Sequence, residues 1–204
     1  MGAGVRRRRI GLLGGSFNPA HDGHRDISLA ALTSLGLDEI WWLVAPQNPL
    51  KPTRGMAPLQ ERLAQARSEA RHPRIRVTDI EIRLGTRFTA DTLAKLVGRY
   101  RSCRFVWLMG ADNLSQIDRW KDWQQIFHLL PIAIFDRPTY TYSALAAKAA
   151  RRFVRERKRE SASHLLALAP PPAWMFVHHR LNPISATAIR AAASQAKALE
   201  RQIR

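Results

Sequence analysis

Residues 14–24 read Gly-Gly-Ser-Phe-Asn-Pro-Ala-His-Asp-Gly-His. They follow a short apolar segment, Ile10 to Leu13, and lead into residues 23–35, whose apolar side chains predict a helix. The two glycines let backbone N–H groups approach an anion closely. The helix start that follows adds free N–H groups and positive potential. The stretch therefore predicts the first strand–loop–helix unit of an α/β protein, with a phosphate site in the loop.

Two histidines, His21 and His24, stand three residues apart at the expected helix start, so they share one face of that helix. Imidazole rings placed there can donate hydrogen bonds to phosphoryl oxygens. The stretch fits neither a Walker loop nor the dinucleotide-binding fingerprint, because it lacks Gly-Lys-Ser/Thr and its glycine spacing differs. The alternatives are a plain strand–helix connection and a histidine metal pair, for which no nearby third ligand is obvious.

Strand-like and helix-like segments alternate along the rest of the chain. We expect strands at residues 10–13, 40–45, 105–109, 132–135 and 174–177, and a weaker strand region at 75–82. We expect helices at residues 23–35, 59–70, 90–100, 123–130, 143–158 and 186–201. This order predicts an α/β fold with a doubly wound parallel sheet and helices on both faces. Ligands then collect at the carboxyl ends of the strands.

Length and composition favour one globular domain. The chain has 204 residues, and we expect a basic N-terminal tail at residues 1–9 and a single domain at residues 10–204. The single cysteine, Cys103, excludes an internal disulfide framework and a cysteine-rich zinc site. No apolar run approaches the roughly 18 residues of a membrane helix. We therefore expect a cytoplasmic protein with no membrane partner.

The strong positive charge raises a second class of function. Lys and Arg number 33 against 16 Asp and Glu, which gives a formal net charge of +17. Such a field attracts polyanions, including nucleic acid and nucleotide phosphates. Part of the charge falls in residues 151–160, where a solvated surface is the favoured interpretation. A non-catalytic, basic nucleic-acid-binding protein remains an alternative, although the aromatic–basic strand pattern of an RNA module is missing.

A second anion-binding pattern opens the last expected helix. Residues 184–190 read Ile-Ser-Ala-Thr-Ala-Ile-Arg. Ser185 is a favourable N-cap and Thr187 falls in the first turn, so their hydroxyls, the free N–H groups and Arg190 could bind a polyphosphate. The alternative is a capped surface helix with an incidental arginine.

Both patterns resemble signatures of the nucleotidylyltransferase superfamily. The resemblance implies a Rossmann-like doubly wound parallel sheet of the nucleotidylyltransferase type. It also implies that the two histidines bind phosphates and stabilise the transition state at the α-phosphorus, without a covalent intermediate. The resemblance implies that the second pattern binds the β and γ phosphates of ATP, and here Ala186 replaces a frequent second serine. The implied catalytic residues are His21, His24 and Arg190, and the implied ATP-binding residues are Gly14, Gly15, Ser16, Phe17, His21, His24, Gly110, Ser185, Thr187 and Arg190.

Residues 105–112, Phe-Val-Trp-Leu-Met-Gly-Ala-Asp, and the later Trp-Lys-Asp-Trp at 120–123 resemble bacterial nicotinate-nucleotide adenylyltransferases. The resemblance implies that Asp112 contacts ribose hydroxyls and Trp120 stacks on the pyridine ring. Backbone N–H groups at Thr89 and Lys121 would bind the nicotinate carboxylate, whereas Trp123 is assigned to packing. The implied residues for nicotinate mononucleotide are Ser16, Asn48, Lys51, Thr89, Asp112, Trp120 and Lys121.

The resemblance implies a reaction of ATP with nicotinate mononucleotide that gives deamido-NAD and pyrophosphate. Mg²⁺ would be carried by the ATP phosphates, because the sequence offers no carboxylate cluster as a cage. The alternative within the superfamily is a pantetheine-phosphate adenylyltransferase, whose chains are usually shorter and lack the loop that holds Trp120. Small-molecule substrates are therefore the expected partners, with no specific nucleic acid.

Overall fold

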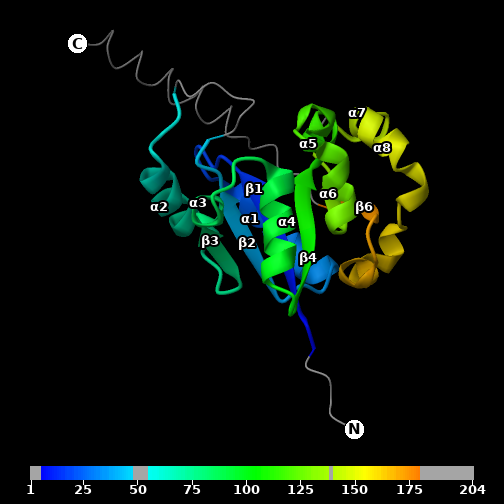
Figure 1. Ribbon diagram of the computed structural model, residues 1–204, viewed down its shortest axis with the longest axis horizontal. Helices are drawn as coiled ribbons and strands as arrows, with labels where there is room; N and C mark the ends of the chain where they lie inside the picture. The colour runs from blue at the N-terminus through cyan, green and yellow to red at the C-terminus, as the bar shows by residue number, and fades with distance from the viewer. Residues whose placement is uncertain (1–5, 48–54, 138–139, 180–204) are drawn as a thin grey trace.

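A six-stranded parallel sheet forms the centre of the protein (Figure 1). The computed structural model describes residues 6–47, 55–137 and 140–179. The strand order is β3-β2-β1-β4-β5-β6. The strands are β1 Arg8–Gly15, β2 Glu39–Val44, β3 Ile75–Thr78, β4 Cys103–Gly110, β5 Ile132–Phe135 and β6 Trp174–Val177. The chain turns from one half of the sheet to the other between β1 and β4, so their carboxyl ends form the topological switch point.

Helices cover both faces of this sheet (Figure 1). One face packs on α1 Asp22–Ser34, α2 Leu59–Ala70 and the 3-10 segment η3 Glu160–Leu168. The other face packs on α3 Ile80–Leu84, α4 Thr89–Arg99, α6 Trp123–Leu129, α7 Thr141–Leu145 and α8 Lys148–Arg152. The short α5 Ala111–Leu114 and the 3-10 turns η1 Ile117–Arg119 and η2 Val154–Glu156 complete the described elements. The predicted doubly wound α/β fold is confirmed.

The continuously apolar strands contribute side chains to the hydrophobic cores on both faces of the sheet. In β2, Trp41 and Leu43 pack on the α4 face, whereas Ile40, Trp42 and Val44 pack on the α1 face. All five are buried, because helices cover both faces of a parallel sheet. This explains why the segment is apolar at every position rather than at every second one.

Two sequence predictions about elements are wrong. The strand region expected at 75–82 stops at Thr78, and Ile80 to Leu84 form the short helix α3. Ile80 is buried but Ile82 is 52% exposed, so their alternation does not mark one face of a strand. Gly85 then ends α3 in the left-handed conformation, with φ of 60°.

The helix expected at 143–158 is instead broken into α7, α8 and η2. Ala147 is extended and separates α7 from α8. Phe153 is pulled into the core, where its ring stacks on Phe127 at 4.2 Å and its carbonyl accepts the Trp174 indole N–H. This burial ends α8, and the expected helix at 186–201 lies outside the described residues.

The first strand, β1, begins two residues earlier than the sequence predicts. Arg8 and Arg9 pair in register with Cys103 and Arg104 of β4, so β1 starts at Arg8 rather than Ile10. The backbone N–H of Arg9 also donates to Asp38 over 2.8 Å. Within the described residues, no helix is long and apolar enough to cross a membrane.

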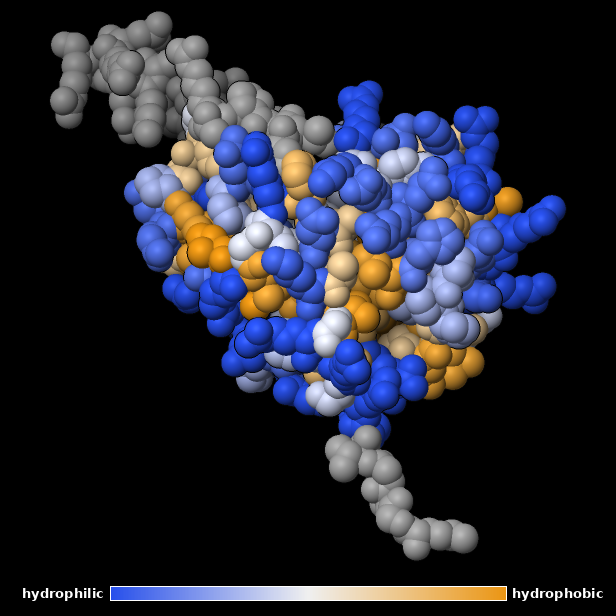
Figure 2. Space-filling model, viewed as in Figure 1, coloured by the Kyte–Doolittle hydropathy of each residue, from blue (hydrophilic) through white to orange (hydrophobic). Residues whose placement is uncertain are grey.

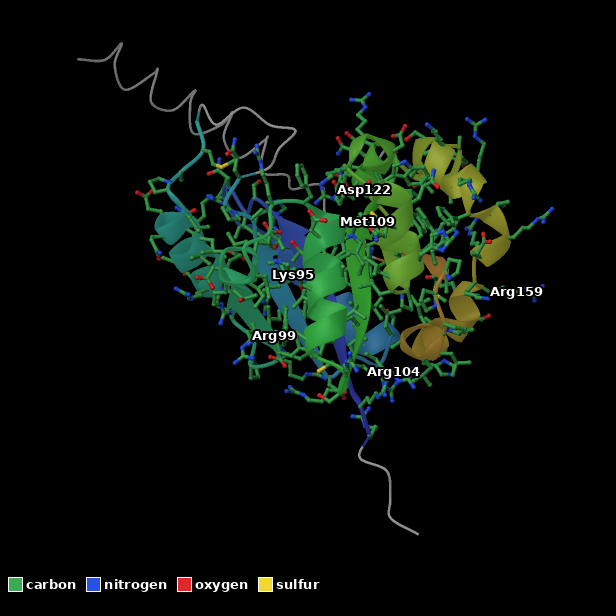
Figure 3. The ribbon with its side chains drawn as sticks, in the orientation of Figure 1. Lys95, Arg99, Arg104, Met109, Asp122 and Arg159 are labelled. Carbon is green, nitrogen blue, oxygen red and sulfur yellow. The ribbon has the colours of Figure 1, made fainter. Side chains whose placement is uncertain are left out.

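The basic segment at residues 148–160 exposes its cations to solvent, as its sequence indicates. The exposed cations are Lys148, Arg151, Arg152, Arg155, Arg157, Lys158 and Arg159. Hydrophilic residues cover most of the visible face in Figure 2. In Figure 3, Arg159 lies at the margin of the molecule, well away from Met109 near the carboxyl end of β4. Arg159 therefore lies away from the site described below.

Candidate active site

The carboxyl ends of β1 and β4 bring together the first predicted loop and the Gly110–Asp112 turn. Figure 3 shows Met109 and Asp122 toward this end of the sheet, and Arg99 and Arg104 toward the other. Gly14 and Gly15 are the last residues of β1, and we call residues 14–18 the phosphate loop. A Cβ on Gly14 would overlap the Trp107 indole of β4, so this close approach requires glycine.

His21 and His24 together cap the start of α1. His21 is the N-cap residue, and its Nδ1 accepts the Gly23 N–H over 3.2 Å. The His21 N–H donates in return to Nδ1 of His24 over 3.3 Å. The two ring centroids lie 3.9 Å apart. Because each Nδ1 accepts a hydrogen bond, each neutral ring carries its proton on Nε2, which remains available to donate to a ligand.

Burial keeps both rings neutral at pH 7. Desolvation lowers the pKa of His21 to about 4, and the Arg137 charge adds to this effect. Desolvation lowers the pKa of His24 to about 3, with further contributions from His21 and Arg137. The site therefore offers two neutral Nε2–H donors rather than two cations, in the geometry of a capped helix N-terminus.

A buried network holds His24 in place. The Ser28 hydroxyl donates to the His24 carbonyl over 2.8 Å, and the Trp42 indole N–H donates to Ser28 over 2.8 Å. The Phe17 ring stacks on Trp42 at 5.0 Å and lies 4.6 Å from the His24 ring. Because the Phe17 side chain is 1% exposed, contact with a ligand is left to its backbone.

Arg137 is a site residue that sequence reasoning missed. Its Nε lies 3.5 Å from Oδ1 of Asp112, so the ends of β5 and β4 are joined by an ion pair. A Cβ on Gly110 would overlap the Asp112 carboxylate and lie 3.1 Å from the Arg137 Nε, so glycine makes room for this pair. After desolvation, the charge of Arg137 also contributes to the lowered pKa of both histidines. Its position directly after an apolar strand was the available signal.

Three of the residues predicted for nicotinate mononucleotide, Thr89, Trp120 and Lys121, lie at the start of α4 and in the loop before α6. Thr89 is the first residue of α4, and Lys121 extends its Nζ to 4.7 Å from the ring of the preceding Phe88. This contact brings two of the segments that carry the predicted carboxylate donors together. Trp120 is partly buried against the core, whereas Trp123 is 9% exposed and packs edge-on against Phe127, as a packing residue should.

Five predicted site residues lie outside the part of the chain that the structure describes. They are Asn48, Lys51, Ser185, Thr187 and Arg190. Ser16 and Asp112 are within it and partly buried, and Gly110 is buried at the end of β4. The described part of the site thus contains the histidine pair, the phosphate loop, the Asp112–Arg137 pair and the Thr89 and Lys121 segments.

The histidine pair makes a stability prediction. In the unfolded chain a histidine titrates near pH 6.5, but in the folded protein His21 and His24 titrate at about 4 and about 3. The unfolded state therefore binds more protons below pH 6.5, and stability is lost as pH falls from there toward the folded values. Each histidine contributes a slope of at most about 1.4 kcal/mol per pH unit.

Chemical denaturation at pH 7 and pH 5 checks this slope. The double variant His21→Asn, His24→Gln should lose less unfolding free energy between these values than the wild type. Burial raises the pKa of Glu81 to about 7, so this carboxyl opposes the histidines between about pH 4.5 and 7. Glu81→Gln is the matched control and should steepen the loss. Equal pH dependence in the double variant and the wild type would contradict the prediction.

Comparisons with known proteins show the family of this chain. Residues 12–192 match the family described as Cytidylyltransferase-like. A protein of Methylorubrum extorquens named "Probable nicotinate-nucleotide adenylyltransferase" is 51% identical over 182 residues, which cover 89% of this chain and 98% of that protein. A protein of the same name from Cereibacter sphaeroides is 54% identical over 182 residues, covering 89% and 96%.

A solved structure supports the fold independently. The Plasmodium falciparum nicotinic acid mononucleotide adenylyltransferase complexed with NaAD superposes with a TM-score of 0.67, over 90% of this chain and 83% of that one. Its sequence identity is 16%, so the likeness concerns the fold alone. The family model and the sequence relatives identify the family. This chain belongs to the cytidylyltransferase-like family of nucleotidyltransferases and is related within it to the nicotinate-nucleotide adenylyltransferases.

Proposed function

We propose that this protein transfers the adenylyl group of ATP to nicotinate mononucleotide, in one catalytic domain expected at residues 10–204, whose first strand begins at Arg8 within the basic stretch 1–9. The observation that carries the proposal is the reciprocal capping of His21 and His24, which aims two neutral Nε2–H donors from a helix N-terminus. The relatives named for this activity support the choice of acceptor. A cytoplasmic location and small-molecule partners are part of the proposal.

The reaction is a displacement at the α-phosphorus of ATP. A phosphate oxygen of nicotinate mononucleotide forms the new P–O bond in line, while the bond to the β-phosphate oxygen breaks and pyrophosphate leaves. The two Nε2–H groups would donate to the phosphoryl oxygens, where charge builds up in the transition state. Arg137 would add a positive charge beside them. Catalysis then rests on positioning and charge stabilisation.

Mg²⁺ enters this proposal as part of the substrate. Among the described residues, no group of three or more His, Cys, Asp or Glu side chains could hold a metal ion. The phosphate oxygens of ATP are the hard ligands that Mg²⁺ prefers, so it would arrive bound to them. Outside the described residues, Ser185, Thr187 and Arg190 remain the proposed ligands of the β and γ phosphates, and Asn48 and Lys51 remain proposed for the acceptor.

The nicotinate carboxylate would be recognised by backbone N–H groups at Thr89 and Lys121. A carboxylate accepts from both donors, whereas the amide NH₂ of nicotinamide mononucleotide cannot accept from either. The contact between Lys121 and Phe88 supports this pairing, because it holds the two segments together. Asp112 would bind ribose hydroxyls, and Trp120 would stack on the pyridine ring.

A pyrophosphate-release assay with several acceptors tests the function. We expect release with ATP and nicotinate mononucleotide, weaker release with nicotinamide mononucleotide, and none with pantetheine phosphate. Release of pyrophosphate with pantetheine phosphate as the sole productive acceptor would favour a pantetheine-phosphate adenylyltransferase. Salt-sensitive oligonucleotide binding without pyrophosphate release would favour the basic nucleic-acid-binding protein.

Trp120→Ala should raise the KM for nicotinate mononucleotide much more than the KM for ATP. An aromatic face contributes about 0.5–1.5 kcal/mol beyond the apolar area it buries, so the total effect on the acceptor reaches roughly tenfold or more. Preference for the acid over the amide should survive, since it depends on backbone donors. Steady-state kinetics measure both constants, and Trp123→Phe is the packing control. A rise in the ATP constant alone would make Trp120 an adenine contact.

A further inference from the structure

Arg62 is a buried cation that joins three segments through their carbonyl groups. It lies in α2 and is 1% exposed. Its Nη1 donates to the carbonyls of Ser16 over 2.6 Å and Ala45 over 2.7 Å. Its Nη2 donates to Pro46 over 2.8 Å, and its Nε donates to Ala57 over 2.9 Å. The phosphate loop, the end of β2 and the entry to α2 thus meet at one side chain.

The partners of this guanidinium are unusual. Burying a charge costs free energy unless it is paired or fully hydrogen-bonded, and a carboxylate is the common partner of a buried arginine. Within residues 6–47, 55–137 and 140–179, the ion pairs include none with Arg62. Backbone carbonyls accept four of its five N–H groups, so the geometry of the loop depends on where this side chain lies.

The Ser16 contact fixes the direction of the next peptide group. In a planar trans peptide, the carbonyl and the following N–H point in opposite directions. The Ser16 carbonyl points at Arg62, so the Phe17 N–H points away from it. Phe17 has a left-handed φ of 46°, and among the described residues no group accepts its N–H. This N–H belongs to the phosphate loop. The ring of the same residue, Phe17, lies 4.6 Å from the His24 ring.

We propose that Arg62 is a positioning residue, which holds the Ser16–Phe17 peptide so that the Phe17 N–H donates to a phosphoryl oxygen beside His21 and His24. This inference rests on the proposed adenylyl transfer. Asn18 supports the same loop from its other end, because its Nδ2 donates to Gly55 over 3.1 Å and its Oδ1 accepts from Ala57 over 3.2 Å. Arg62 therefore sets the direction of the loop, while Asn18 keeps it attached when Arg62 is changed.

The first test is kinetic. Arg62→Lys keeps the charge but cannot reach four carbonyls with a planar fork. We expect its kcat to fall by about 10–100-fold, somewhat less than the loss of a whole oxyanion donor, with both KM values within about threefold of the wild type. The kcat of Arg62→Ala should fall further than that of Arg62→Lys, and millimolar guanidinium should restore part of it. Arg67→Ala is the matched control, since Arg67 is exposed on the same helix.

The second test has its deciding readout in the wild type. The chain has seven phenylalanines, so selective ¹⁵N-phenylalanine labelling gives a readable amide spectrum. In the wild type, a non-hydrolysable ATP analogue should move the Phe17 amide proton downfield, and Arg62→Lys should reduce that shift.

The outcomes separate this inference from the proposed function. Wild-type kcat in Arg62→Lys, or a folded Arg62→Ala that guanidinium does not rescue, would overturn the positioning role. An unmoved Phe17 amide in the wild type with the analogue bound would overturn it as well. Failure of the wild type to release pyrophosphate would instead count against adenylyl transfer itself.

Discussion

His24→Ala is expected to reduce kcat by about 10²–10³-fold while the protein stays folded. The His24 Nε2–H is a neutral donor aimed from the N-terminus of α1, and its Nδ1 is already used by the His21 N–H. Losing one preorganised donor to a developing oxyanion costs about 2.7–4 kcal/mol, which corresponds to that rate loss. Pyrophosphate release measures kcat, and circular dichroism measures the fold.

Two further variants separate catalysis from helix capping. His24→Asn can place its Oδ1 near the position of Nδ1, so it can keep the bond from His21 but has no group at Nε2. His24→Gln can place an NH₂ group near the position of Nε2. We expect Asn to be nearly as inactive as Ala, and Gln to retain more activity than either. A folded His24→Asn with near-normal kcat would remove His24 from the chemistry.

The sequence predicted the fold better where apolar runs are unbroken than where they are interrupted. β5 and β6 have the residue limits that the sequence predicted, because every position in them faces one of two cores. The prediction failed at Ile80 and Ile82, where a two-residue alternation continued past the true end of β3. It failed again at residues 143–158, where the extended Ala147 and the burial of the Phe153 ring against Phe127 divide the expected helix.

The sequence predicted the site in part as well. The spacing of His21 and His24 predicted that they share one face of α1, which the structure confirms. Their reciprocal capping was not predictable, because it depends on the extended backbone of His21, with φ of −156°. Arg62 was missed, since its role comes from a contact with a residue 46 positions away that no local pattern encodes. Arg137 follows an apolar strand, but its partner Asp112 is 25 positions away.

Arg137→Gln is expected to lower kcat by about 10²–10³-fold, because it removes a fixed positive charge beside the transferring phosphoryl group. Arg137 lies two residues after the end of β5, pairs with Asp112 at 3.5 Å, and acts electrostatically on both histidines. Steady-state pyrophosphate release measures the loss. Arg137→Lys keeps the charge without the fork and should retain more activity than Gln.

The same variant should change the histidines before any substrate is bound. The positive charge of Arg137 disfavours the protonated rings, so its removal should raise the pKa of His21 and His24 toward 6.5. NMR titration of the ligand-free protein measures both values. Arg137→Lys should leave them close to the wild type, because the effect depends on charge. Unmoved pKa values in Arg137→Gln would mean that the guanidinium lies too far from the pair to act on the phosphoryl group that they bind.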